Sequence, residues 1–235
     1  MLPALTTQQV TWYLTRSTGA VCLLLLTGAV VLGIVEVLRV SSPVWPRFAI
    51  DLLHRDVSLL AFAFLLVHIV TTLLNTFTSI GPLEAIVPFI SAYRPLWLGL
   101  GAIAFDLLIA VMLTSLLRRR IPYDTFKVVH WLVYLSWPVA VLHGMGAGSD
   151  TAGVWMLIID VLCVLAVFAA FAWRVHGSLR TDPITARLTV AASVVLLGAL
   201  AVWLARGPLG SEWARRSGTP RQLLGKAERA RTGAD

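Results

Sequence analysis

Six long apolar segments, separated by short polar connections, dominate the hydropathy pattern of this chain. They run over about residues 12–38, 48–77, 96–117, 128–143, 154–173 and 188–204. A helix needs about 20 apolar residues to cross a hydrocarbon core about 30 Å thick, and these segments are of that order. The pattern therefore predicts an all-α fold, a polytopic membrane bundle of about six transmembrane helices.

The connection after the second segment is long and apolar. It reads SIGPLEAIVPFISAYRP, and three prolines interrupt it. Because it is too short and too broken to span a bilayer, we expect an interfacial loop or half-helix there. We divide the chain into a polar lead over residues 1–10, a membrane domain over 11–205 and a basic, mobile tail over 206–235.

Composition agrees with a membrane protein. Of the 235 residues, 58% are hydrophobic and 13% are charged, which is more apolar surface than a soluble domain can bury. Cys22 and Cys163 each lie within an apolar segment without a CxxC motif, so we expect no disulfide or thiol chemistry. The net charge of +7 gathers at helix ends and in the tail, where it indicates membrane topology and no nucleic-acid partner.

Basic residues are distributed unequally between the two sides of the expected bundle. The connections after the first, third and fifth segments, with their adjoining ends, hold ten of them: Arg39, Arg47, Arg55, Arg118, Arg119, Arg120, Lys127, Arg174, Arg180 and Arg187. The opposite side has only Arg16 and Arg94 before the tail, which adds seven Lys/Arg and three Asp/Glu. Because basic loops stay in the cytoplasm, we expect both termini outside a bacterial cytoplasmic membrane, although the tail's charge argues the other way.

Four of the five histidines fall on two segments with nearly matched spacing. His54 and His68 are fourteen residues apart, and His130 and His143 are thirteen apart. At about 1.5 Å per residue, each pair spans about 20 Å, roughly two-thirds of the hydrocarbon core. If both segments run in the same direction, His54 meets His130 near the cytoplasm and His68 meets His143 near the outside. Two stacked haems need such levels of facing imidazoles, because haem iron accepts imidazole as an axial ligand.

The helical phase of the second pair fits this arrangement less well. Fourteen residues leave the first pair within about 40° of one helix face, whereas thirteen leave the second pair about 140° apart. Pro138 lies between its members and is expected to kink the helix, and Gly144 is expected to end it. These breaks offer a way to re-aim His143.

Two stretches and the paired histidine spacing resemble the ferric reductase-like transmembrane domain family. The stretches are YRPLWLGLGAIAFDLLIAVMLTSLLRRR and FKVVHWLVYLSWPVAVLH, and the resemblance covers about residues 10–175. The family includes the membrane portions of NADPH oxidases and ferric reductases, and the haem subunit of a periplasmic methionine sulfoxide reductase system. It implies two b-type haems, which pass electrons across the membrane one at a time, with four axial ligands: His54, His68, His130 and His143. It also implies that Arg16 lies beside the outer haem, which supports termini outside.

The sequence departs from the larger family members after the sixth segment. No G-x-G-x-x-G motif follows a strand and about 30 residues remain, so we expect no NAD(P)H or FAD domain. We assign no catalytic residue, and whether the chain has a catalytic site of its own stays open. Electrons would come from a separate cytoplasmic flavoprotein or from membrane quinol. The acceptor would lie outside, as ferric iron, a flavin or a reductase partner. We therefore expect the electron-transfer subunit of a transmembrane oxidoreductase, embedded in lipid.

Two other interpretations stay open. One is a metal-ion transporter or permease whose intramembrane histidines bind zinc or copper, although about 20 Å within each pair prevents a compact site. The other is a structural subunit whose histidines are polar contacts between helices. Arg16, Arg55 and Arg94 are either interfacial anchors or haem propionate partners. For Asp106 and Asp160, we favour pairing with a neighbouring helix over a role in a proton relay.

Overall fold

The structure is a computed structural model that describes residues 6–39, 42, 45–78, 80–178 and 183–225. Within these ranges the regular elements are helices, and no strand is present. The long helices are α1 (Thr7–Val37), α2 (Arg47–Leu73), α4 (Pro95–Leu116), α6 (Val133–Ala147), α7 (Val154–Ser178) and α8 (Pro183–Arg206). The shorter ones are α3 (Pro82–Ile86), α5 (Tyr123–His130) and α9 (Trp213–Arg216).

The helices that are long and apolar enough to cross a membrane number six in the described part of the chain. Five are single helices, and the sixth is the α5–α6 unit, Tyr123–Ala147. This arrangement confirms the predicted all-α, six-span membrane fold. The described part of the broken apolar connection, from residue 80 on, contains the five-residue helix α3, which is too short to span.

Local sequence signals explain where several helices begin. The Thr6 hydroxyl accepts a hydrogen bond from the Gln9 backbone N–H, and the Gln9 side chain accepts one from the Thr6 N–H at 2.9 Å, which forms a capping box. Pro82 and Pro95 lie in the first turns of α3 and α4, where a missing N–H costs no helical hydrogen bond. Before Pro95 the backbone of Arg94 is left-handed, with a φ of 44°, which turns the chain into α4.

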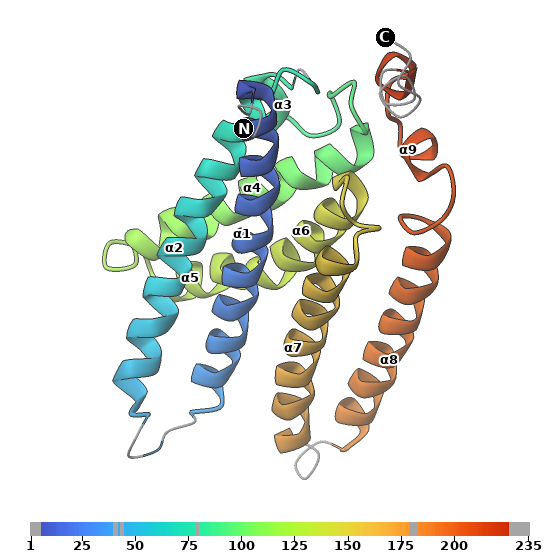
Figure 1. Cartoon of the computed structure of the whole chain (residues 1–235). Coiled ribbons are helices and arrows are strands. Elements are labelled where there is room, and N and C mark those ends of the chain that lie inside the picture. Colours follow the sequence, from blue (N-terminus) through green and yellow to red (C-terminus); the bar gives the residue numbers. More distant parts are fainter. Residues whose placement is uncertain (1–5, 40–41, 43–44, 79, 179–182, 226–235) are drawn as a thin grey trace, which may run out of the picture.

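Helix α1 is central to the packing. It contacts α2 over much of its length and also contacts α6 and α7, while α4 contacts α6 and α8 lies at the edge against α7 (Figure 1). The main core cluster lies where α1, α6 and α7 meet, and its buried residues are Leu23, Leu26, Val30, Ile34, Trp137, Val141, Met145, Cys163, Val164 and Ala170. Large apolar side chains on α8 stay exposed, among them Val195 at 71%, and lipid would cover this face.

The start of α1, α3 and α9 all lie at one end of the bundle, which is called the terminal end below (Figure 1). Residues 206–225 of the predicted tail contact this end, which the sequence did not indicate. The Gly218 carbonyl accepts a hydrogen bond from the Arg94 N–H at 3.1 Å, and Trp213 Nε1 donates to the Gly146 carbonyl at 3.2 Å. Residues 1–5 of the predicted lead and 226–235 of the tail lie outside the described residues.

Candidate functional site

The first histidine pair lies toward the end of the bundle that is opposite the terminal end. His54 of α2 and His130 of α5 have ring centroids 6.3 Å apart and planes inclined by 74°. His54 Nδ1 lies 3.0 Å from the Ala29 carbonyl oxygen of α1. Because a carbonyl only accepts, Nδ1 carries the proton there, and the Nε2 lone pair is free to bind a metal.

His130 differs from His54 in its surroundings. The Phe126 ring stacks on it at a centroid distance of 5.2 Å. Its Nδ1 is buried and has no hydrogen-bond partner among the residues that the structure describes. Within the described residues, the Nδ1 atom of His130 therefore differs from that of His54, because no hydrogen bond holds it.

The second histidine pair lies toward the terminal end. His68 of α2 and His143 of α6 both line a cavity of about 320 Å³. His68 Nδ1 lies 2.8 Å from the Thr15 carbonyl oxygen, and His143 Nδ1 lies 2.8 Å from the Trp97 carbonyl oxygen. By the same argument, each imidazole has a protonated Nδ1 and an unprotonated Nε2. The structure thus brings together both histidine pairs that the sequence matched, and their role as ligands stays a prediction.

The unfavourable thirteen-residue spacing is accommodated by a break in the helix. Residues 131 and 132 form a turn between α5 and α6, immediately after His130, while Pro138 lies inside α6. The expectation that Gly144 ends the helix is wrong, because α6 continues to Ala147 and the Gly148 N–H donates to the Gly144 carbonyl at 2.9 Å. A helix broken at this point need not keep the ideal 100° per residue between the two histidines.

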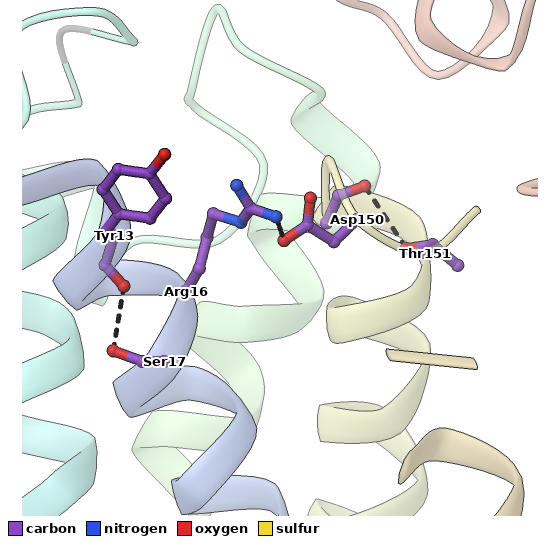
Figure 2. Close-up of polar contacts among 6 residues, drawn as sticks. Tyr13, Arg16, Ser17, Asp150 and Thr151 are labelled. Atoms are coloured by element: carbon purple, nitrogen blue, oxygen red, sulfur yellow. Dashed lines mark hydrogen bonds and ion pairs between the residues drawn. The ribbon is translucent and has the colours of Figure 1, made fainter. Parts of the chain in front are cut away.

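Arg16 belongs to the wall of the His68–His143 cavity. It forms an ion pair with Asp150, which lies in the loop after α6 (Figure 2). The two side chains are only 22% and 18% exposed, and the guanidinium carbon lies 3.8 Å from the centroid of the Trp12 ring. Asp150 was not a candidate from the sequence, because its loop, GMGAGSDTAG, carries only a composition typical of a flexible connection.

Arg94 holds the end of α6, immediately before the same loop. It is 5% exposed and donates hydrogen bonds to the carbonyls of Gly146 and Ala147 at 3.0 and 3.1 Å, and to the Thr219 hydroxyl at 3.0 Å. Burial lowers the pKa of its guanidinium from the usual value. Arg94 is therefore a structural cap on the carbonyl end of α6, where a cation is favourable.

Other candidates from the sequence have simpler surroundings. Arg55 is exposed and pairs with the adjacent Asp56 at 2.9 Å, as a surface anchor would. Asp160 is 1% exposed, and neither carboxylate oxygen has a hydrogen-bond partner within the described residues. The expectation that Asp160 pairs with a neighbouring helix is therefore wrong for this part of the chain.

Comparison with known families gives one match. The family described as "Ferric reductase like transmembrane component" matches residues 18–141. This range runs from within α1 to within α6 and contains three of the four paired histidines. Arg16 lies two residues before its start, and His143 lies two residues after its end. Searches of curated proteins and of solved structures gave no significant match.

Proposed function

Because this chain belongs to the ferric reductase-like transmembrane family, we propose that it is a di-haem b membrane protein that carries electrons across the bilayer one at a time. Membership of the family gives the membrane electron-transfer role. The number of haems, their ligands, the direction of transfer and the partners belong to the proposal. The observation that carries it is the presence of two levels, each combining an imidazole from α2 with one from the α5–α6 span.

The donor set fits a haem. Three of the four imidazoles donate from Nδ1 to a helix carbonyl, which leaves Nε2 as a lone-pair donor, the form in which metal-binding histidines are usually held. Two imidazoles per level match the two axial positions of a porphyrin iron. The cavity between His68 and His143 is mostly apolar, with the Arg16 guanidinium in its wall as a partner for an anionic propionate.

When bound, each haem would supply a one-electron iron couple with no open coordination site, which suits electron transfer better than substrate binding. The protein's own contribution is to hold and orient the rings. The carbonyls of Thr15, Ala29 and Trp97 fix three of the imidazoles.

The proposed direction is from the cytoplasm outward. Six spans put the start of α1 and α9 on the same side of the membrane, and the excess of basic residues in the odd connections supports a cytoplasmic location for the opposite end. The His54–His130 level would then receive electrons from a cytoplasmic flavoprotein or quinol. The His68–His143 level would deliver them to an outer acceptor, such as ferric iron, a flavin or a separate reductase.

A vesicle experiment tests the proposed transfer. Purified full-length protein is reconstituted into liposomes that contain ferricyanide, and dithionite is added outside together with a potassium ionophore to remove the opposing potential. We expect the wild type to reduce the trapped ferricyanide, and His68→Ala and His143→Ala to slow this at least about tenfold. His176→Ala is the matched control, because His176 is exposed near the end of α7. A wild-type rate equal to that of protein-free liposomes that contain ferricyanide would contradict the proposal.

A further inference from the structure

Three of the paired histidines lie against a glycine of a neighbouring helix. In each case the glycine comes four residues after the residue whose carbonyl accepts the hydrogen bond from the imidazole Nδ1. The sets of carbonyl residue, glycine and histidine are Thr15, Gly19 and His68; Ala29, Gly33 and His54; and Trp97, Gly101 and His143. The same arrangement thus occurs on two helices, α1 and α4, and at both histidine levels.

Helix geometry explains the four-residue offset. The carbonyl of residue i points along the helix toward the N–H of residue i+4, which takes one of its two lone pairs. The side chain of residue i+4 lies on the same helix face, so its Cβ borders the approach to the second lone pair. A glycine at i+4 leaves this approach open, and an imidazole can donate to the same carbonyl.

The space for a methyl group is too small at Gly101, tight at Gly19 and at the edge of ordinary contact at Gly33. A Cβ added at Gly101 would lie 2.6 Å from both Cε1 and Nδ1 of His143, which is closer than real Cβ atoms approach. At Gly19 it would lie 3.0 Å from Cε1 and Nδ1 of His68, and at Gly33 it would lie 3.4 Å from Cε1 of His54. The expected sensitivity to alanine therefore falls in the order Gly101, Gly19, Gly33.

Close packing of helix backbones is the usual reason for glycine in membrane helices. It does not explain these three positions, because the nearest atoms to each added Cβ are those of an imidazole ring. Gly28 shows the contrast on the same helix as Gly19: its nearest neighbour would be Cγ1 of Val57 at 3.7 Å, an ordinary contact.

At the fourth histidine, His130, the corresponding position on the neighbouring helix is not a glycine, and this difference supports the same relationship. His130 and His143 are thirteen residues apart. The positions on α4 that lie thirteen residues after Trp97 and Gly101 are Ala110 and Thr114. There the Thr114 hydroxyl donates to the Ala110 carbonyl at 2.8 Å, so this carbonyl already has a second donor. Among the Nδ1 atoms of the four paired histidines, that of His130 has no partner within the described residues.

We propose that Gly19, Gly33 and Gly101 are positioning residues for the haem ligands, because their missing Cβ atoms open a carbonyl to each imidazole. The carbonyl fixes the Nδ1–H tautomer, and the open helix face fixes the angle of the ring plane. This inference rests on the proposed haem-binding function, and it concerns how the chain presents Nε2 to the iron.

The test compares Gly101→Ala and Gly28→Ala in the full-length, detergent-purified protein, made in cells supplied with a haem precursor. Haem per chain and the low-spin ferric EPR signals, which report the orientation of the axial imidazole planes, are measured for each. We expect Gly101→Ala to lower the affinity for one haem by about 10- to 100-fold or to shift the EPR signal of that haem, while the second haem is unchanged. The retained second haem shows that the bundle has folded, and Gly28→Ala should match the wild type.

Two results would overturn the inference. One is a Gly101→Ala protein with the wild-type haem content and EPR signals, and the other is equal damage by Gly28→Ala. If Gly101→Ala does not fold, Gly19→Ala decides, because the added Cβ would lie 3.0 Å from the His68 ring and should shift the EPR signal of the same haem. Wild-type haem content and EPR signals in Gly19→Ala would then overturn the inference. A wild type without haem would refute the proposed function itself, and this result is distinguishable because it involves no glycine variant.

Discussion

Arg16 of α1 forms an ion pair with Asp150 of the loop after α6 (Figure 2), and both residues line the cavity that His68 and His143 also line. The two residues are far apart in the sequence and bring opposite charges to one level of the proposed haem pair. A positive charge favours the reduced form of a nearby haem, and a negative charge opposes it, because reduction adds an electron. The balance of this ion pair should therefore set the potential at that level.

Single substitutions in this ion pair should move one haem potential in opposite directions. Arg16→Gln removes the positive charge and should lower the midpoint potential of the haem at His68 and His143, while Asp150→Asn should raise it. A change of about 60 mV, a tenfold change in the equilibrium constant, is the expected scale. A spectroscopic redox titration measures both haems in one sample.

The double variant and a remote variant serve as controls. Arg16→Gln combined with Asp150→Asn should return close to the wild-type potential, because the two charges largely compensate each other. Arg55 lies far from His68 along α2, and its charge is exposed and screened, so Arg55→Gln should leave the potential of this haem unchanged. Shifts of the same sign for both single variants would refute the electrostatic assignment.

Each histidine level should lose its haem independently. His54→Ala and His68→Ala are expected to give proteins with one remaining haem each, because the two side chains belong to different levels of the bundle. The pyridine haemochrome assay gives the haem content, and redox titration tells which potential is missing. Loss of both haems from each single variant, in protein that elutes at the wild-type size, would argue against two independent levels.

Arg94 should contribute to stability through the loop that carries Asp150. Arg94→Leu leaves the Gly146 and Ala147 carbonyls without their charged donor, and it should lower the free energy of unfolding by about 2–3 kcal/mol. Denaturation in detergent, followed by tryptophan fluorescence, measures the change. Arg118→Leu is the matched control, because Arg118 is exposed after α4 and should change stability by less than about 0.5 kcal/mol. Equal effects of the two variants would contradict the role of Arg94 as a helix cap.

The proposed topology can be tested by labelling single introduced cysteines. In intact cells, an impermeant maleimide should label Ser211→Cys, near α9, and should label Asp124→Cys only after the cells are made permeable. Both positions are exposed, and they lie at opposite ends of the proposed topology. The native Cys163 is 2% exposed within a span, so it should give little background. The reverse labelling pattern would invert the direction of electron transfer proposed for this chain.

The sequence alone predicted the six spans and the arrangement of the histidines in two pairs at two heights, because both follow from local patterns along the chain. Hydropathy depends only on neighbouring residues, and spacings of thirteen and fourteen residues convert directly into height along a helix. The charge of Arg16 also had a candidate role from its position in the first span.

The remaining contacts depend on tertiary structure. Arg94 meets Thr219 across 125 positions of sequence, and no local pattern indicates that the basic C-terminal segment returns to the start of α4. The turn at residues 131 and 132 lies in the apolar run HWLVYLSW, which contains no breaker at that point. Gly19, Gly33 and Gly101 look like ordinary glycines of membrane helices until the imidazoles are placed against them.

The claim that four histidines hold two b-type haems is tested most directly by the haem content of the purified full-length protein. The measurement combines the haem-to-protein ratio with the dithionite-reduced minus oxidised spectrum, for protein made in cells supplied with a haem precursor. We expect sharp b-type bands and about two haems per chain. Protein that is correctly folded and free of haem would contradict it, and a ratio of one would contradict the two-level arrangement.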